Sequence, residues 1–154
     1  MGASFGSRLK RFSGACALLL LLLAGPLWAA DPQDAILGTW FTDDGASRVE
    51  VTRATAADGS IVYSGKLTWL KEPGRDGKPA LDVNNSDVTL RSRPLLGITI
   101  LADFKASATG WSGGTVYAPR RGKSFPAELS VLAAGRLQLN IKAGMISRTD
   151  YWTR

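Results

Sequence analysis

The chain has 154 residues and a formal net charge of +6, and after residue 30 it contains neither histidine nor cysteine. Without imidazole or thiolate, that part has no Ser-His triad, no cysteine nucleophile and no ordinary zinc site. Three of the basic residues, Arg8, Lys10 and Arg11, lie in the first 30 residues. The remainder is therefore only mildly basic, and we do not expect nucleic acid as a partner.

Residues 1–30 have the pattern of a secretory signal peptide. The basic start is followed by an apolar stretch, Ala15 to Ala24, then by Gly25-Pro26 and the small residues Ala29 and Ala30. The stretch is shorter than the roughly 20 residues that span a bilayer, so we expect cleavage after Ala29 or Ala30 rather than a membrane anchor. The mature protein is then periplasmic or secreted, without stable membrane insertion.

Residues 31–154 suffice for one domain, and apolar residues alternate with polar ones along them, which is typical of strands with one buried face. Turn residues such as Asp58-Gly59, Arg121-Gly122 and Gly135 separate these segments. The expected strands are Thr39 to Thr42, Ser47 to Arg53, Ile61 to Leu70, Leu96 to Phe104, Ser112 to Tyr117, Ser124 to Leu132, Leu137 to Lys142 and Met145 to Thr153. About eight such strands joined by short turns predict an all-β fold, a single antiparallel β-barrel.

One connection is too long for a hairpin turn. It runs from Glu72 to Pro94, between two expected strands. Within it, Ser86 to Arg91 is expected to form a helical turn, with Asn85 or Ser86 as its cap.

The motif Gly38-Thr39-Trp40 opens the first expected strand and resembles the start of the lipocalin and calycin barrels. In those barrels the tryptophan closes one end and an arginine from the last strand covers it. The resemblance implies this role for Arg148 or Arg154, and a guanidinium does stack well on an indole ring.

A second resemblance covers nearly all of the chain after residue 30, which is similar to domain-of-unknown-function family 2147. The segments that carry it are Gly38-Thr39-Trp40, Lys66 to Leu70, Asp76 to Pro79, Leu81 to Asn85, Leu90 to Gly97, Trp111 to Gly114, Tyr117 to Pro119, Gly122-Lys123 and Tyr151 to Arg154. The resemblance implies a small exported bacterial protein with a lipocalin-like barrel, and it implies no activity. Many members carry cysteines before the second long strand and near the last one. Here 54–61 and 142–148 contain none.

Five residues are the candidates for ligand binding: Trp69, Arg91, Arg93, Trp111 and Tyr117. The arginine forks suit carboxylate or phosphate groups. The alternative is an internal ion pair of Arg93 with Asp82 or Asp87, which would hold the long connection to the barrel. The aromatic residues line a ligand space inside the barrel or form its core, because an eight-stranded barrel allows either.

The oxygen-rich stretch with Asp82, Asn84, Asn85 and Asp87 is the densest set of possible calcium ligands. It fails the calcium-loop template, because Asp87 stands at the glycine position and Arg93 at the final glutamate position. We therefore expect these side chains to cap turns, and we expect no metal and no cofactor.

These observations favour a non-enzymatic binding protein for a small amphipathic or apolar ligand, in the barrel or at its mouth. The alternative is a structural or interaction protein of the cell envelope with a filled barrel and a protein partner. An acid-base enzyme that uses carboxylates is the third hypothesis, which the missing histidine and cysteine make the weakest.

Overall fold

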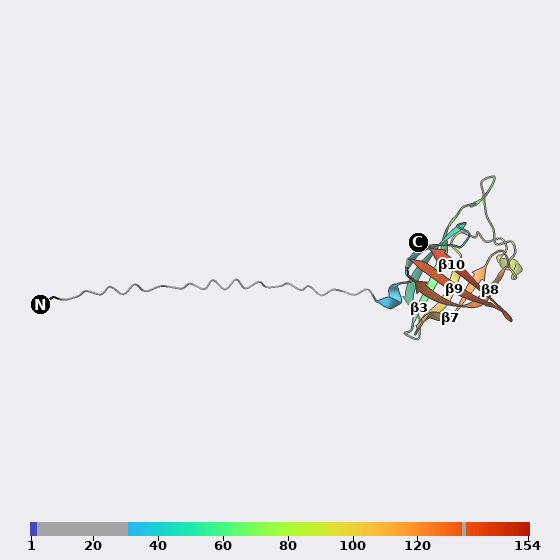
Figure 1. The fold of residues 1–154 in the computed structure, drawn as a ribbon. Coiled ribbons are helices and arrows are strands. Elements are labelled where there is room, and N and C mark those ends of the chain that lie inside the picture. Colours follow the sequence, from blue (N-terminus) through green and yellow to red (C-terminus); the bar gives the residue numbers. More distant parts are fainter. Residues whose placement is uncertain (3–30, 134) are drawn as a thin grey trace.

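The structure is a computed structural model that describes residues 1–2, 31–133 and 135–154. The expected signal peptide lies almost entirely outside the described residues. Figure 1 shows a closed barrel of strands, with a hairpin that projects from one end and a short helix beside it. No helix in the described part of the chain is long and apolar enough to cross a membrane.

Eight antiparallel strands close the barrel, in the order β1-β10-β9-β8-β7-β6-β3-β2. The all-β fold with a single antiparallel β-barrel, which the alternation predicts, is therefore confirmed. The strands of the barrel are β1 (Gly38–Phe41), β2 (Ser47–Thr55), β3 (Ile61–Leu70), β6 (Thr99–Ser107), β7 (Gly110–Ala118), β8 (Lys123–Leu132), β9 (Arg136–Ala143) and β10 (Ile146–Thr153). They agree with the expected segments to within about three residues at each end, which is ordinary fraying of boundaries.

The long connection holds more structure than the sequence predicts. It contains a small two-stranded hairpin of β4 (Gly74–Arg75) and β5 (Lys78–Pro79), which alternation cannot reveal in pieces of two residues. The expected helical turn is present as the 3-10 helix η2 (Val88–Leu90), but the expected cap was wrong. Asp87 caps it instead, and its carboxylate accepts a hydrogen bond from the Thr89 backbone N–H at 2.9 Å.

Alternate side chains of the strands, with a few buried residues from the segments beside them, form one core. The members are Ile36, Trp40, Val49, Val51, Tyr63, Leu67, Ile98, Ile100, Leu101, Phe104, Trp111, Val116, Ala127, Leu129, Leu137, Leu139 and Trp152. Two strand glycines make room for this packing. A Cβ at Gly114 would lie 2.6 Å from the Phe104 ring, and one at Gly65 would lie 2.8 Å from Cγ1 of Val49. Large side chains thus lie directly on the backbone of neighbouring strands, and this part of the interior is closely packed.

The two ends of the barrel differ, and we call them the plug end and the mouth. The plug end holds the 3-10 helix η1 (Pro32–Asp34), the start of β1 and the end of β10. There the buried Trp40 donates its indole N–H to the Ile36 carbonyl at 2.7 Å. The Arg154 guanidinium covers its ring at 4.2 Å, so of the two candidate arginines the structure selects Arg154. Arg148 pairs with Asp150 instead.

The mouth is the end that carries the β1–β2, β3–β6, β7–β8 and β9–β10 connections. In the ring of strands, the β1–β2 and β7–β8 turns stand on opposite sides. Nevertheless Arg120 of one turn and Asp44 of the other form an ion pair at 3.4 Å. This exposed pair therefore spans the mouth.

Candidate functional site

The long connection folds back on itself and is bound to the rim of the mouth. Its two arms pair through the Leu81–Pro94 bridge and the hydrogen bond from the Asp82 N–H to the Arg93 carbonyl at 3.0 Å. The Ser86 N–H also bonds to the Gly122 carbonyl at 2.9 Å. Gly122 has a φ of +65°, and a Cβ there would overlap the backbone oxygen of Asn84. Glycine is therefore needed where the β7–β8 turn meets the connection.

A buried carboxylate forms the centre of this attachment. Asp82 is only 1% exposed, and its Oδ1 accepts a hydrogen bond from the Tyr117 hydroxyl at 2.6 Å. Its Oδ2 accepts from the Asn85 amide at 2.7 Å and from Nη2 of Arg93 at 2.8 Å. The internal Asp82–Arg93 pair that the sequence allowed is thus present. It joins both arms of the connection to β7.

The surroundings of Asp82 keep it ionised. Burial alone would raise its pKa, but the hydrogen bonds from Tyr117, Asn85 and Arg93 outweigh that effect and lower the pKa below its ordinary 3.8. Burial and the bond to Asp82 raise the pKa of Tyr117 above its ordinary 10.0. A carboxylate that is held charged with both oxygens occupied has no proton to give, which is typical of a structural tether.

The register places Tyr117 outside the barrel. Val116 pairs with Phe125 and is buried in the core, so its neighbour Tyr117 lies on the opposite face. The connection therefore packs on the outer wall of β7. Arg93 lies 5.6 Å from the Tyr117 ring, and Arg91 donates to the Asn85 carbonyl at 2.8 Å. Three of the five expected binding residues are thus brought together, and all three hold the connection.

Trp69, the fourth candidate, lies at the mouth on the other side of the connection. It is 37% exposed, and the Arg48 guanidinium lies 5.0 Å from its ring. The Phe41 ring lies 4.6 Å from the same guanidinium. No residue pattern indicates Arg48 as a site residue, because the contact depends on strand register.

Trp111, the fifth candidate, is not near the others. It is 4% exposed and packs edge-on against Tyr63, with ring centroids 6.0 Å apart. Its indole N–H has no hydrogen-bond partner among the described residues. A polar hollow of about 430 Å³ borders it between the β6–β7 turn and the strands β8 and β9.

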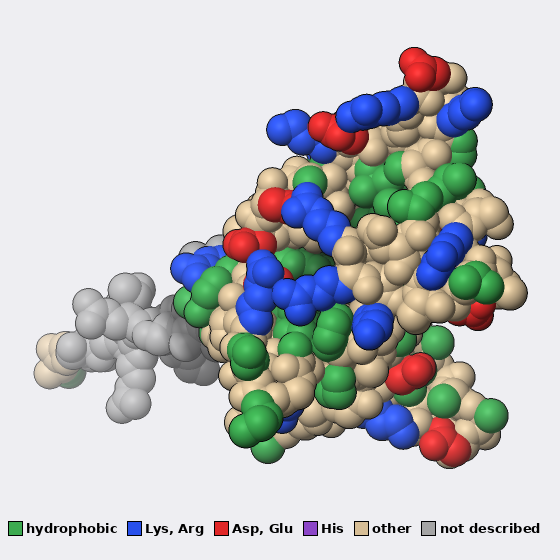
Figure 2. Space-filling model, turned by 90° about the vertical axis from the view of Figure 1, so that its right-hand side faces the viewer, with side chains coloured by type: hydrophobic (Ala, Val, Ile, Leu, Met, Phe, Trp, Pro, Cys, Tyr) green, Lys and Arg blue, Asp and Glu red, His purple; other side chains and the backbone are tan. Residues whose placement is uncertain are grey.

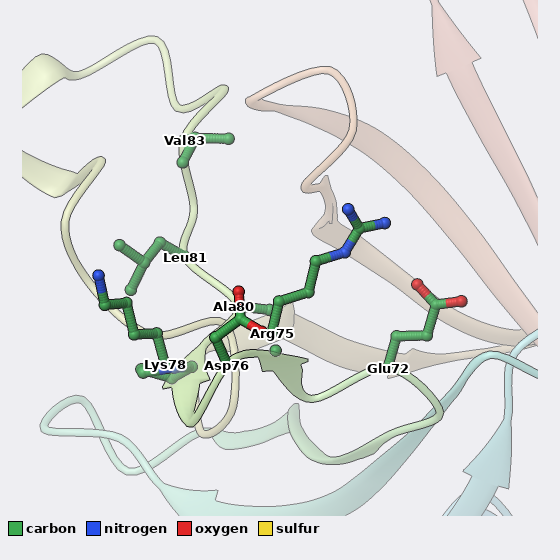
Figure 3. Close-up of a pocket in the computed structure, with 9 residues that line it drawn as sticks. Glu72, Arg75, Asp76, Lys78, Ala80, Leu81 and Val83 are labelled. Atoms are coloured by element: carbon green, nitrogen blue, oxygen red, sulfur yellow. The ribbon is translucent and has the colours of Figure 1, made fainter.

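A second hollow, of about 450 Å³, lies beside the projecting β4–β5 hairpin. Its lining combines apolar and charged side chains: Glu72, Arg75, Asp76, Lys78, Pro79, Ala80, Leu81 and Val83 with the backbone of Gly74. Figure 3 shows Lys78, Leu81 and Val83 toward one side, with Arg75 and Glu72 toward the other. Leu81 and Val83 are 37% and 60% exposed. Among the described residues, no group of three or more acidic side chains converges as a metal site would require.

Figure 2 looks onto the mouth and shows Lys and Arg side chains across its middle and upper part, with apolar side chains between them. Basic residues outnumber acidic ones in the connections and strand ends of this end. Two of the acids, Asp82 and Asp44, are already paired with Arg93 and Arg120. The mouth therefore offers positive charge beside apolar surface, which suits an amphipathic molecule with an acidic group.

The family can now be stated, because a family model matches residues 38–154, the whole barrel. The chain belongs to DUF2147, described as an uncharacterized protein conserved in bacteria. Among solved structures, this family member is similar to protein HP1028 from Helicobacter pylori, whose title places it in the lipocalin family. The TM-score is 0.54 at 22% identity, over 77% of this chain and 81% of that one. The similarity shows the fold. A comparison with curated proteins finds no match.

Proposed function

We propose that this protein is a non-enzymatic binding protein that holds a small amphipathic ligand at the mouth of the barrel. The hollow beside the β4–β5 hairpin carries the proposal. Its volume of about 450 Å³ falls in the range of small-molecule sites, about 300–1,000 Å³. Leu81 and Val83 offer an apolar wall, while Arg75 and Lys78 offer charge at its rim.

The packed core favours a ligand at the mouth over one deep in the barrel. Phe104 lies on Gly114, and Val49 and Leu101 lie on Gly65, so these side chains fill the space that a deep ligand would need. The tethered connection supplies a binding surface instead. Its attachment through Asp82 and Arg93 holds the hollow in place before any ligand arrives, which lowers the entropy cost of binding.

The carboxyl groups support a role without catalysis. A general acid needs a raised pKa, whereas each described carboxyl group with a shifted pKa has a lowered one: Asp44, Asp58, Asp82 and Asp87. The pattern of residues 1–30 supports export, so we assign the protein to the periplasm or the exterior. A ligand with an apolar part needs a carrier in that aqueous compartment.

Binding of N-phenyl-1-naphthylamine, an uncharged apolar probe that fluoresces out of water, tests the proposal. We expect saturable binding of one molecule to residues 31–154. Val83→Asp should weaken it by about tenfold or more, because it puts a charge on the apolar wall. Val88→Asp is the matched control, since Val88 is 66% exposed on the same connection but does not line the hollow.

Equal probe affinity in Val83→Asp and Val88→Asp, or no probe binding, would reject this site. The second candidate function would then stand, an interaction protein of the cell envelope with a filled barrel. The packing on Gly65 and Gly114 favours it, as do the apolar residues Val83, Val88 and Leu96, exposed on the connection. Exposed apolar groups of this kind are typical of protein-binding surfaces.

A further inference from the structure

A row of three side chains crosses β1, β2 and β3 at the mouth. Phe41 pairs with Arg48 across β1 and β2, and Arg48 pairs with Trp69 across β2 and β3. A β-bulge between Arg48 and Val49 shifts the register at this point. The extra residue is Thr68 of β3, so the bulge turns Trp69 to the same face as Arg48, whose guanidinium lies between the two rings.

The Arg48 guanidinium is held at its faces and open at its edge. Its carbon lies 4.6 Å from the Phe41 ring centroid and 5.0 Å from that of Trp69, with one ring on each flanking strand. Stacking on two rings fixes the plane of the guanidinium. The N–H donors of a guanidinium all lie in its plane, so contacts of its two faces with rings leave these donors available.

No described residue takes up these donors. Arg48 forms no ion pair and no side-chain hydrogen bond in the described part of the chain, although it is exposed at the mouth. Arg121 and Arg136, which each lie over a single ring, also have no described side-chain partner, whereas two other stacked arginines are occupied. Arg93, on Tyr117, donates to Asp82, and Arg154, on Trp40, donates to the carbonyls of Ala35 and Leu37. Arg48 thus combines a fixed plane with unused donors.

We propose that Phe41, Arg48 and Trp69 form a binding site for an oxyanion with two accessible oxygens, a carboxylate or a phosphate, at the polar end of an amphipathic ligand. The fork of the guanidinium matches two such oxygens with parallel hydrogen bonds. The exposed Trp69 ring gives the first carbons of the ligand an apolar surface. The proposal names the head group for the function proposed above and rests on it.

The hollow begins three residues after Trp69 in the chain, at Glu72. Lys71 follows Trp69 by two residues, and its N–H bonds to the Ala46 carbonyl at 2.8 Å. This bond holds the start of the connection against the β1–β2 turn, next to Arg48. The following residue, Glu72, already lines the hollow.

Calorimetric titration with four ligands of equal chain length tests the site: dodecanoate, dodecyl phosphate, dodecanol and dodecyltrimethylammonium. We expect the two acids to bind more tightly than the alcohol and the cation. Arg48→Ala should weaken both acids by about tenfold to a hundredfold, as loss of charge-assisted hydrogen bonds predicts. Arg48→Lys should retain more affinity for the acids than Arg48→Ala but less than the parent, because lysine keeps the charge but lacks the forked donors. A preference between the two acids identifies the head group.

Arg136→Ala is the matched control, because Arg136 also stacks on an exposed ring, Tyr151, at 4.5 Å and has no described side-chain partner, but it contacts one ring only and stands on β9, three strands from Arg48 around the barrel. It should leave acid binding unchanged. Equal affinities for acid, alcohol and cation, or an Arg48→Ala protein that binds the acids as the parent does, would overturn the anion site. Full recovery by Arg48→Lys would overturn the forked contact. N-phenyl-1-naphthylamine binding reports separately on the hollow. If the probe does not bind but the acids still bind in a way that depends on Arg48, the hollow is rejected and the anion site is kept.

Discussion

Both ends of the barrel place an arginine on a tryptophan, but they use the arrangement differently. At the plug end, Arg154 lies 4.2 Å from the Trp40 ring and donates to two backbone carbonyls, those of Ala35 and Leu37. Trp40 itself is fully buried and donates to Ile36. Nη2 of Arg154 and the indole N–H of Trp40 both have partners within the protein, which is typical of a contact that stabilises the fold.

At the mouth, Arg48 lies 5.0 Å from Trp69, which is 37% exposed. Here the same stacking fixes the guanidinium without using its hydrogen-bond donors. The comparison shows that stacking alone does not identify a binding arginine. What distinguishes the two ends is whether the donors are occupied, and this difference leads to three predictions on stability.

Replacing the plug tryptophan should have the largest effect. Trp40→Ala removes a fully buried indole and leaves a cavity, for which we expect a loss of about 3–5 kcal/mol in the free energy of unfolding. Urea denaturation followed by circular dichroism measures it. Trp69→Ala at the mouth is the comparison, and it should cost roughly 1 kcal/mol, because the ring is partly exposed and packs mainly on Arg48. Equal losses in both variants would contradict the distinction between the ends.

Loss of the tether charge should have an intermediate effect. Asp82→Asn leaves Arg93 and Tyr117 without their carboxylate, and we expect a loss of about 1–3 kcal/mol at neutral pH. Because the folded-state pKa of Asp82 lies below its ordinary 3.8, its contribution is complete above that pH and disappears as the pH falls through the folded-state value. The difference in the free energy of unfolding between the parent and Asp82→Asn should therefore become smaller below about pH 4.

Urea denaturation at several pH values measures this gap. Asp43→Asn is a suitable control, since Asp43 is exposed in the β1–β2 turn. The free energy of unfolding of Asp43→Asn should stay within about 0.5 kcal/mol of the parent's at every pH, as is usual for surface substitutions. A gap between parent and Asp82→Asn that stays constant down to acid pH would show that Asp82 contributes through shape rather than charge.

The fold could be predicted from the sequence because it depends on local patterns. Alternation revealed the eight barrel strands, and the Gly38-Thr39-Trp40 motif indicated the plug. The Asp82–Arg93 pair was foreseen as one of two alternatives for Arg93, because a long ordered connection needs such a contact.

The candidate sites could be predicted only in part: Trp69 was a candidate, but its partners depend on register and loop path. Arg48 meets Trp69 through a bulge that no residue pattern announces. Tyr117 faces outward because Gly113, with a φ of +78°, lies where the pairing of β7 with β8 shifts, between Trp111 and Gly114. The sequence shows the pair Gly113-Gly114, but it does not show which face of the sheet the side chains after this pair occupy. The β4–β5 hairpin and its hollow arise from strands too short to show a period.

The smallest effect concerns Arg154 and Arg48, the arginines stacked on Trp40 and Trp69. Arg154→Ala should lower the free energy of unfolding by about 1.5 kcal/mol, since it removes one cation–π contact and the charged hydrogen bonds to the Ala35 and Leu37 carbonyls. Arg48→Ala should lower it by only about 0.5–1 kcal/mol, because stacking is all that it loses. Thermal and urea denaturation of the two single variants, without ligand, measure the difference. Adding dodecanoate should then stabilise the Arg154→Ala protein more than the Arg48→Ala protein, because a ligand stabilises a fold in proportion to how tightly it binds. If Arg48→Ala proved the more destabilising of the two, its guanidinium would be part of the scaffold, and the contrast between an occupied and an open arginine would fail.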